Sequence, residues 1–232
     1  MMPAASVPII TIDGPSSSGK GTIARAVARA LDWHLLDSGA LYRLVALAGQ
    51  GRGANPDDID AHVMLARAMR VEFLTDSAGY ERVLLEGQDV TGAVRSEQAG
   101  QGASRVAVWP ALRDALVERQ RAFAAPPGLV ADGRDMGTVI FPAAELKVFL
   151  TASADERATR RHKQLISKGS AANLADLSRE IAERDHRDTS RAVAPLKPAS
   201  DAVMLDSTGL SIQQVVARVL ALGRERGLWQ VG

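Results

Sequence analysis

The sequence predicts an α/β protein in which a five-stranded parallel sheet is covered by helices and interrupted by a small antiparallel insert. Short runs of apolar and β-branched residues alternate with segments whose apolar residues recur at helical spacing, a pattern typical of parallel sheets. Between residues 70 and 91, three short runs instead follow one another across turn sequences, a pattern typical of antiparallel hairpins.

The first third of the chain is expected to alternate strands and helices. The run VPIITID (7–13) is apolar, β-branched and followed by glycine, which predicts a buried strand, and helical spacing from Gly19 to Leu31 predicts the helix after it. A second strand at 33–36 leads into a helix that Asp37–Ser38 would cap. The sequence NPDD (55–58) predicts a third helix, with its asparagine as the cap and its proline at the first helical position.

The antiparallel insert is expected from three runs that end in turn residues. They are RVEFLT (70–75), ERVLLE (81–86) and QDVT (88–91), with DSAGY as the first turn and Glu-Gly as the second.

The rest of the chain returns to alternating strands and helices. Residues 96–125 have helical spacing broken at Pro110, and residues 154–191 form a charged helical segment with Gly169 as a joint. Ser211 is expected to cap the last helix. The further strands are expected at about 129–133, 146–150 and 202–206.

Polar residues and a glycine stand where the expected strands of the parallel sheet end. The carboxyl ends of parallel strands meet at one edge of a sheet, and ligands of such sheets bind beyond that edge. The residues at or just after these ends are Gly14, Asp37, Asp132, Thr151 and Asp206. We therefore expect them to share one rim, where a ligand would bind.

Composition limits the class of protein. At 232 residues, the chain can bury a sizeable core, either as one α/β domain with insertions or as two small domains. Its formal net charge of +1 gives no field that would attract nucleic acid or a membrane surface. The absence of cysteine excludes disulfides, thiolate metal sites and a cysteine nucleophile. The sequence shows neither a basic, apolar leader nor a run of about 18 apolar residues, so we expect a cytoplasmic protein.

The segment GPSSSGKGT (14–22) lies between the first expected strand and the first expected helix. A glycine-rich loop that opens a helix and carries a lysine is typical of phosphate binding, in which backbone N–H groups and the lysine contact a nucleotide. The alternative is a plain turn. Since both the strand and the helix that the motif requires are predicted, we favour the phosphate loop.

A phosphate loop does not name a reaction, because switches, motors, transporters and kinases all carry one. A guanine-nucleotide switch would usually show N-K-x-D, but the two asparagines of the chain, Asn55 and Asn173, are not followed by lysine. The loop ends in GKGT, so that the hydroxyl of Thr22 comes one residue later than in the common motif. This ending resembles the nucleoside-monophosphate kinases and leaves open whether Thr22 meets Mg²⁺ directly or through water.

Two further motifs bring arginine to the expected rim. SGALYR (38–43) begins a helix at a strand end, so its N–H groups and Arg43 could face an anion, although Arg43 alone could also be a surface residue. DGRDMG (132–137) places two aspartates and an arginine in a loop after a central strand, which an ordinary turn would not need. Both motifs favour a second phosphate at the rim.

The segment ERDHRDTSR (183–191) concentrates charge at the end of a helix. Such a run usually forms a solvated helix face. Arg184, Arg187 and Arg191 are spaced three and four residues apart, however, so one helical face would carry all three guanidinium groups. A mobile lid that neutralises a transferring phosphoryl group needs such a face.

The chain closely resembles the bacterial cytidylate kinases, and the resemblance extends from Ile9 to about Leu220. It is carried by the phosphate loop and by four further segments: LLDSGALYR, LEGQDVTGAVR, LVADGRDMGTVIFP and ERDHRDTSRAVAPL. The resemblance implies a three-layer P-loop kinase core (1–66, 106–153 and 192–232), an insert that binds the nucleoside monophosphate (67–105) and a helical lid (154–191). It also implies the reaction, in which ATP phosphorylates CMP or dCMP in pyrimidine nucleotide metabolism.

The resemblance further implies roles for particular residues. ATP would be bound by Gly14, Pro15, Ser16, Ser17, Ser18, Gly19, Lys20, Gly21 and Thr22, together with Mg²⁺ that Thr22 meets directly or through water. Catalysis would depend on Lys20, Arg134, Arg184 and Arg191. CMP would be bound by Ser38, Arg43, Ser104, Arg113, Arg134, Asp135, Arg184 and Asp188. The implied partners are these small molecules alone, with no nucleic acid or membrane, and the expected state is a monomer.

The resemblance also implies which part of CMP each of these residues would contact. The acceptor phosphate would be held by Arg43 and Arg134, with Ser38 beside them. Cytosine would be read by Ser104, Arg113 and Asp135, and the ribose would be contacted by Arg184 and Asp188. Arg191 would reach the phosphates from the lid.

The implied chemistry agrees with the residues present. A phosphate monoester has a second pKa of about 6 and is mostly dianionic at neutral pH, so it attacks without a general base. The acceptor phosphate and the ATP phosphate are both anions and must meet in line, so Mg²⁺, lysine and arginine are needed to neutralise their charge. A lid is needed because water would compete as the acceptor. Two alternatives remain at this point: a kinase for another small acceptor such as UMP, dTMP or shikimate, and a regulatory ATP-binding module without turnover.

Overall fold

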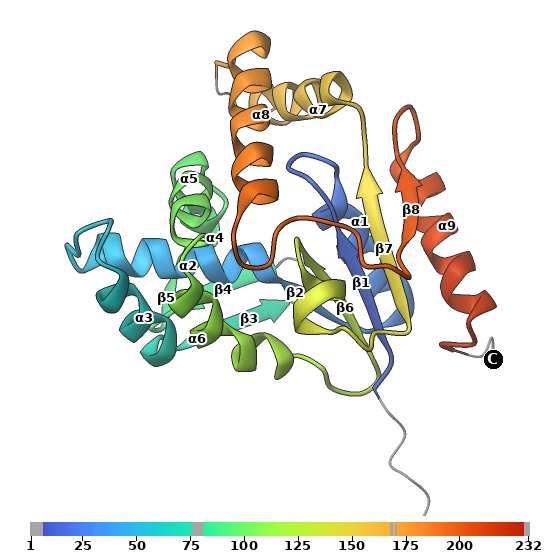
Figure 1. Ribbon diagram of the computed structural model, residues 1–232, viewed down its shortest axis with the longest axis horizontal. Helices are drawn as coiled ribbons and strands as arrows, with labels where there is room; N and C mark the ends of the chain where they lie inside the picture. The colour runs from blue at the N-terminus through green and yellow to red at the C-terminus, as the bar shows by residue number, and fades with distance from the viewer. Residues whose placement is uncertain (1–6, 76–80, 168, 170, 230–232) are drawn as a thin grey trace, which may run out of the picture. The chain divides into compact units, whose positions relative to one another are not determined.

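The computed structural model describes residues 7–75, 81–167, 169 and 171–229 (Figure 1). The chain forms two compact units: the first unit consists of residues 1–37 and 121–232, and the second unit of residues 38–120. Across the described ranges, no helix has both the length and the apolar content that crossing a bilayer requires.

The first unit contains the predicted five-stranded parallel sheet. The register places Asp37 opposite Asp132 and Thr151 opposite Asp206, so these polar strand ends share one rim, as the sequence predicted. Gly14 follows the central strand at the same rim. In spatial order the strands are β2 (His34–Asp37), β6 (Leu129–Gly133), β1 (Ile9–Asp13), β7 (Leu146–Thr151) and β8 (Val203–Asp206).

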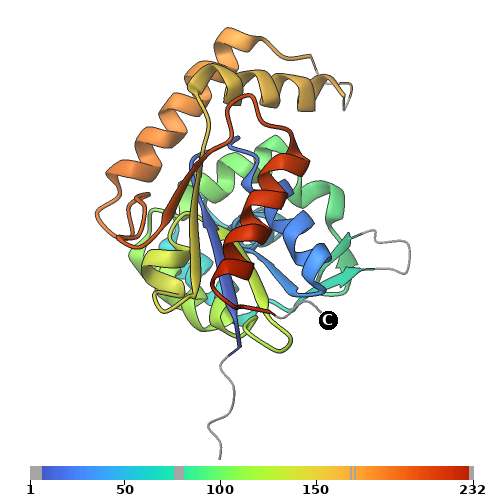
Figure 2. The ribbon, with the colours of Figure 1, turned by 90° about the vertical axis from the view of Figure 1, so that its right-hand side faces the viewer.

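Two helices cover one face of this sheet. α1 (Lys20–Leu31) and α9 (Ile212–Glu225) lie side by side against the strands (Figure 2). Burial of one aliphatic side chain contributes about 1.5–3 kcal/mol, so their shared core holds the rim in a fixed geometry. The side chain of Ser211 caps α9, which confirms the predicted cap. The core cluster includes Ile10, Ile12, Ile23, Val27, Val130, Leu146, Val148, Leu150, Val215 and Val219.

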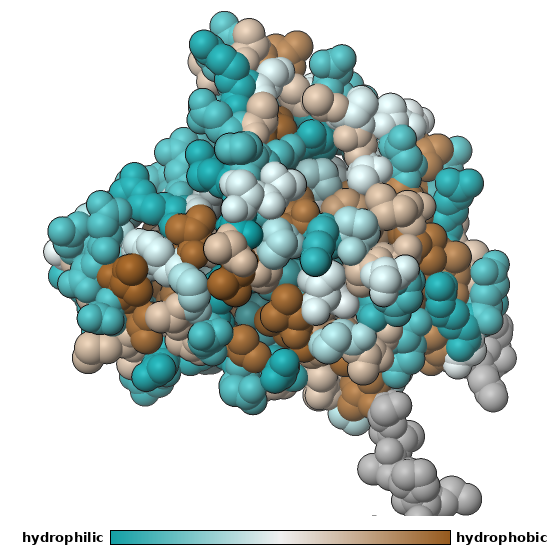
Figure 3. Space-filling model, viewed as in Figure 1, coloured by the Kyte–Doolittle hydropathy of each residue, from teal (hydrophilic) through white to brown (hydrophobic). Residues whose placement is uncertain are grey.

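The two charged helices of the first unit lie beyond the carboxyl end of β7, as Figures 1 and 2 show. They are α7 (Ala154–Ile166) and α8 (Leu174–Ser190), and they pack against each other. Gly169 stands between them with φ of 75°, a left-handed backbone conformation that favours glycine, which confirms the predicted joint. Their outer surface is largely hydrophilic in the view of Figure 3.

The second unit confirms the predicted antiparallel insert. Its sheet has the order β3 (Val71–Thr75), β4 (Glu81–Leu85) and β5 (Gln88–Asp89). The predicted turn DSAGY (76–80) lies outside the described residues. The helices are α2 (Ser38–Gly51), α3 (Ile59–Ala68), α4 (Thr91–Val94), α5 (Glu97–Val106) and α6 (Pro110–Arg121), which ends at the boundary of the unit.

The predicted start of the third helix is wrong. α3 begins at Ile59, and its cap is Asp58, whose side chain accepts a hydrogen bond from the N–H of Ala61 at 2.9 Å. The side chain of Asn55 instead accepts a hydrogen bond from the N–H of Asp57 at 3.1 Å. Asn55 therefore forms a local turn ahead of the helix, which is the other common use of asparagine before proline.

The predicted strand at 88–91 is also too long. It ends at Asp89, and Thr91 begins the short helix α4. The N–H and the hydroxyl of Thr91 both donate to Asp89 Oδ1, at 3.0 and 2.6 Å. These local bonds compete with the sheet and turn the chain. A further element, the single π-helical turn η1 (Met136–Ile140) after β6, was not predicted at all.

Replacing Gly14 with alanine is expected to destabilise the first unit. A Cβ at this position would lie 2.1 Å from the carbonyl oxygen of Leu150 on β7, and the φ of Gly14 is 155°. Overpacking of this kind costs about 1–3 kcal/mol, and we expect thermal unfolding several degrees below that of the wild type. Gly92→Ala is the control, because nothing lies within 4 Å of its Cβ position. Equal melting temperatures for both variants would contradict the prediction.

Candidate functional site

The phosphate loop, residues 14–22 between β1 and α1, has the backbone of an anion-binding loop. Gly14, Ser17 and Gly19 adopt positive φ angles of 155°, 60° and 90°. Turns of this kind aim successive N–H groups at one anion. α1 begins at Lys20 and has no acidic residue of its own in its first turn, so the positive end of its dipole can face an anion. The hydroxyl of Ser18 is buried and has no hydrogen-bond partner among the residues that the structure describes, so a ligand oxygen could accept its hydrogen bond.

Lys20 is a buried cation in this loop. Its Nζ donates to the carbonyl oxygen of Pro15 at 3.1 Å, so the side chain folds back across the loop. Burial lowers the pKa of Lys20, and the nearby Arg134 lowers it further. Burial likewise raises the pKa of Asp132, whose Oδ2 lies 2.9 Å from where a Cβ on Gly21 would stand. A phosphate placed here would favour the charged lysine, because an opposite charge restores its pKa.

Three arginines surround Asp188, and we call Arg134, Arg184 and Arg191 the arginine cluster. Arg134 Nε donates to Asp188 Oδ2 at 2.8 Å, and Arg191 Nε donates to the carbonyl oxygen of Asp188 at 3.2 Å. Burial by itself would raise the pKa of Asp188, but Arg134, Arg191 and Arg184 outweigh burial and lower it. The side chain of Arg191 is only 4% exposed. Asp132 and Asp185 also act on Arg134, but three arginines around one aspartate favour a further anion such as a phosphate.

The inward face of α8 differs from the prediction. Ile181 and Asp188 are buried, and Arg184 is half-buried, but Arg187 is exposed. At 3.6 residues per turn, Arg187 lies about 120° around the helix from Ile181. Arg191 comes after the helix, as its C-cap residue with ψ of 134°. The prediction that one helical face carries all three guanidinium groups is therefore wrong.

Two residues that the sequence did not single out hold the start of the phosphate loop. Asp185 of α8 accepts a hydrogen bond from the backbone N–H of Ser16 at 3.2 Å. Arg157 of α7 forms an ion pair with Asp185 and donates to the carbonyl oxygen of Ser16 at 3.1 Å. Both charged side chains are mostly buried, at 19% and 11% exposure. The backbone of Ser16 is thus held by α7 and α8 together.

A third unexpected residue, Arg160, holds the end of the loop. Its Nη1 donates to the carbonyl oxygen of Ser18 at 3.0 Å and to Ser207 Oγ at 2.9 Å, and its Nη2 donates to the carbonyl oxygen of Ser207 at 2.7 Å. Ser207 follows β8 at the rim. One feature of the sequence could have indicated this role. Arg157 and Arg160 follow an expected strand and are three residues apart, a spacing that places both on one side of a helix.

The loop that carries Arg134 and Asp135 is anchored by the end of β1. Asp13 accepts hydrogen bonds from the N–H groups of Met136 at 2.9 Å and Gly137 at 2.8 Å. Burial raises the pKa of Asp13 to about 6, against the effect of these two donors. Asp135 is itself buried, at 4% exposure. The two predicted residues of this loop therefore have little freedom to move.

The other predicted acceptor residues lie in the second unit. Arg43 donates to the carbonyl oxygen of Val94 at 3.0 Å, so its guanidinium is tied to α4. Arg113 is buried, lies 5.7 Å above the ring of Tyr42 and donates to the carbonyl oxygen of Ala107 at 3.0 Å. Ser38 and Ser104 are buried, on α2 and α5, which pack against each other.

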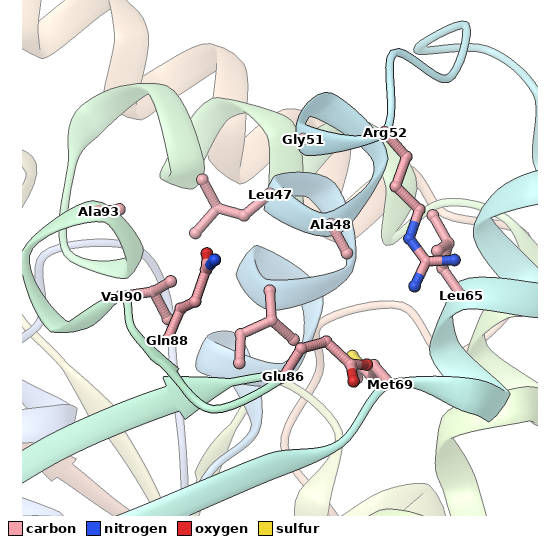
Figure 4. Close-up of a pocket in the computed structure, with 11 residues that line it drawn as sticks. Leu47, Ala48, Gly51, Arg52, Leu65, Met69, Glu86, Gln88, Val90 and Ala93 are labelled. Carbon is pink, nitrogen blue, oxygen red and sulfur yellow. The ribbon is translucent and has the colours of Figure 1, made fainter.

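The second unit also contains a cavity of about 290 Å³ (Figure 4). Its wall is mainly apolar, with Leu47, Leu65 and Met69 among the lining residues, and its polar groups are those of Arg52, Glu86 and Gln88. None of the residues predicted to bind ATP or CMP lines it. This cavity therefore does not coincide with the candidate site.

The site has few ligands for a resident metal. Among residues that the structure describes, no three histidine, cysteine or acidic side chains gather in a way that could hold an ion. Thr22 is exposed in the first turn of α1, one residue after the glycine that Asp132 approaches. Hydroxyl and carboxylate oxygens are ligands that Mg²⁺ accepts, usually beside substrate phosphates. The residues therefore fit a Mg²⁺ ion that arrives with a nucleotide.

Comparison with known proteins points to one family. The profile described as "Cytidylate kinase" matches residues 10–225 of the chain. A cytidylate kinase of Pseudomonas syringae pv. tomato is 61% identical over 215 residues, which cover 92% of this chain and 94% of the relative. A cytidylate kinase of Pseudomonas paraeruginosa is 55% identical over 228 residues, or 98% of this chain and 99% of the relative. A cytidylate kinase of Azotobacter vinelandii is 58% identical over 214 residues, which cover 92% of this chain and 93% of the relative.

Proposed function

The chain belongs to the cytidylate kinase family, and on that premise we propose that it transfers the γ-phosphoryl group of ATP to CMP or dCMP. The products are ADP and CDP or dCDP. The enzyme is an ATP-dependent nucleoside-monophosphate kinase of pyrimidine nucleotide metabolism. We further propose that it acts as a monomer in the cytoplasm on small-molecule substrates, without nucleic acid or membrane.

The observation that carries this proposal is the combination of a phosphate loop with a buried excess of positive charge. Burial lowers the pKa of Lys20, Arg134 and Arg184 lower it further, and Asp132 and Asp188 oppose this only in part. Phosphoryl transfer is catalysed mainly by positioning and by neutralisation of charge on the transferring group. In our proposal Lys20, Arg134, Arg184 and Arg191 perform that neutralisation.

We assign the donor site to the phosphate loop, residues 14–22, with Mg²⁺ bound beside the nucleotide. Thr22 would hold the ion directly or through water, and the carboxylate of Asp132 is a second oxygen near the start of α1. Mg²⁺ would supply charge neutralisation for the triphosphate. The side chains of Lys20 and Arg191 are buried and that of Arg134 is mostly buried, which limits the screening of their charges by water.

We assign the acceptor site by motif. The resemblance to the family gives CMP to Ser38, Arg43, Ser104, Arg113, Arg134, Asp135, Arg184 and Asp188. In support, Ser104, Arg113 and Asp135 are all buried, and hydrogen bonds to a base are stronger where water is excluded. We also propose that residues 67–105 form the insert that binds the monophosphate and that residues 154–191 form the lid, with residues 1–66, 106–153 and 192–232 as the core.

An ADP-release assay with CMP, dCMP, UMP and AMP tests the proposed function. We expect turnover with CMP and dCMP well above turnover with UMP and AMP. Faster turnover with UMP would make the protein a kinase for another acceptor. ATP binding without turnover on any acceptor would instead indicate a regulatory nucleotide-binding module.

Arg191→Ala is expected to lower kcat about ten- to a hundredfold and to change the KM for CMP by less. Loss of one charge-assisted hydrogen bond costs about 1.5–3 kcal/mol, and an arginine of the lid acts mainly in the closed complex near the transition state. Arg187→Ala is the matched control, since Arg187 is exposed in the last turn of α8, the helix that Arg191 directly follows. A rise in the KM for CMP with kcat unchanged would place Arg191 in ground-state binding.

A further inference from the structure

Asp185 brings a carboxylate to a phosphate loop, where negative charge is expected only from a ligand. Its Oδ1 accepts the N–H of Ser16 at 3.2 Å, and its other oxygen pairs with Arg157. Ser16 is buried, with 4% of its surface exposed. The contact joins residues 169 positions apart, so it is made by the folding of α8 over the loop and not by local sequence.

The partners of Asp185 are those that bind a phosphate oxygen. Backbone N–H groups of a glycine-rich loop and an arginine fork are the standard donors to phosphate. A second carboxylate on the same side of α8 behaves alike: Asp188 holds Arg134, whose Nη2 lies 3.4 Å from Ser16 Oγ. Asp185 and Asp188, three residues apart on α8, thus bind groups at one end of the phosphate loop that could otherwise bind a phosphate: the Ser16 N–H, Arg157 and Arg134.

We propose that Asp185 is a positioning residue of the donor site, which takes the place of a phosphate on the Ser16 N–H and on Arg157 until a nucleotide arrives. The inference rests on the proposed function only in taking residues 14–22 as the site of the ATP phosphates. When the triphosphate binds, it replaces the carboxylate on these donors. Arg157 then turns from an internal carboxylate to the nucleotide, and no bond is made or broken.

This arrangement lowers the affinity for ATP. A binding site that is free for only a fraction of the time has an apparent Kd equal to the intrinsic Kd divided by that fraction. A carboxylate that occupies the donors about nine-tenths of the time would weaken binding about tenfold. The same contact keeps Arg157 and the Ser16 backbone ordered in the absence of nucleotide, which spares ATP the cost of ordering them.

The test is ATP binding without acceptor, measured by titration calorimetry on the full chain. Asp185→Asn removes the charge and keeps the shape, and Asp185→Ala removes both contacts. We expect both variants to bind Mg-ATP about three- to tenfold more tightly than the wild type and to bind inorganic tripolyphosphate more tightly by a similar factor. Adenosine, which has no phosphate, should bind equally to all of them.

The matched control is Asp176→Asn, which removes a negative charge from an exposed position of the same helix, where Asp176 pairs with Arg179. It should leave the Kd for ATP unchanged. A merely structural role of Asp185 cannot produce tighter binding. Weaker binding in both Asp185 variants would make the carboxylate a permanent brace of the loop, and unchanged binding would remove it from the donor site. Either result overturns the proposal.

The same preparations separate this proposal from the proposed function. The wild-type protein assayed for ADP release with CMP tests the reaction, whereas the titrations contain no acceptor. A wild type that binds ATP but does not phosphorylate CMP would contradict the proposed function and leave the test of Asp185 intact. In an active enzyme, Asp185→Asn should lower the KM for ATP and leave the KM for CMP within about twofold, because the displaced contact lies on the donor side.

Discussion

Lys20→Met is expected to reduce kcat by about a hundred- to a thousandfold while the protein remains folded, the loss typical when one preorganised charge or donor is removed from a transition state. Lys20 is buried, and its neighbours Arg134 and Arg184 are also cations. Its ammonium group is therefore held beside like charges at a cost to stability. Such a cost is typical of a group placed for a charge that develops during the reaction, and methionine would even relieve it.

The measurement is kcat for ADP release with CMP, beside thermal unfolding of the same samples. Lys163→Met is the matched control, since Lys163 is an exposed lysine on α7, outside the phosphate loop. We expect its kcat to equal that of the wild type. A Lys20→Met enzyme that works within about threefold of the wild type would remove Lys20 from the mechanism.

Asp135→Asn is expected to shift the choice of base from cytosine toward uracil. Cytosine presents an N4 amino donor beside the acceptors N3 and O2, whereas uracil presents an O4 acceptor and an N3–H donor. A carboxylate only accepts hydrogen bonds and a guanidinium only donates them, so Asp135 suits N4 and Arg113 suits N3 or O2. Asp135 is buried, so a mismatched partner could not be replaced by bulk water.

One mismatched pairing costs about 1–3 kcal/mol, or roughly ten- to a hundredfold in discrimination. The asparagine amide can rotate to donate to O4, so the variant should lose activity on CMP and gain relative activity on UMP. We would compare kcat/KM for the two acceptors in the wild type, in Asp135→Asn and in Asp114→Asn, an exposed aspartate on α6. A ratio of CMP to UMP that stays constant across all three proteins would show that Asp135 does not read the base.

The order of strands and helices followed from the sequence because it depends on local spacing. The apolar strand at 9–13, the glycine loop after it and the helix from Lys20 need only neighbouring residues to be identified, and all three occur in the structure. The wrong predictions at Asn55 and Thr91 also arose from reading local sequence. At each place two local structures suited the sequence equally well. The hydrogen bond that the Asp57 N–H donates to Asn55, and the one that Thr91 donates to Asp89, decided which of them formed.

What the sequence determined by itself was therefore the α/β order, the phosphate loop with Lys20, and the likeness to one kinase family, since each is written in contiguous residues. Only the tertiary structure decided which charges of α7 and α8 turn inward. Arg157, Arg160 and Asp185 stand in runs of charge that suit a solvated helix equally well, and their partners Ser16 and Ser18 lie 141 to 169 residues away. The direction of a charged side chain depends on what packs against its helix, and for these residues that is the loop at the opposite end of the chain.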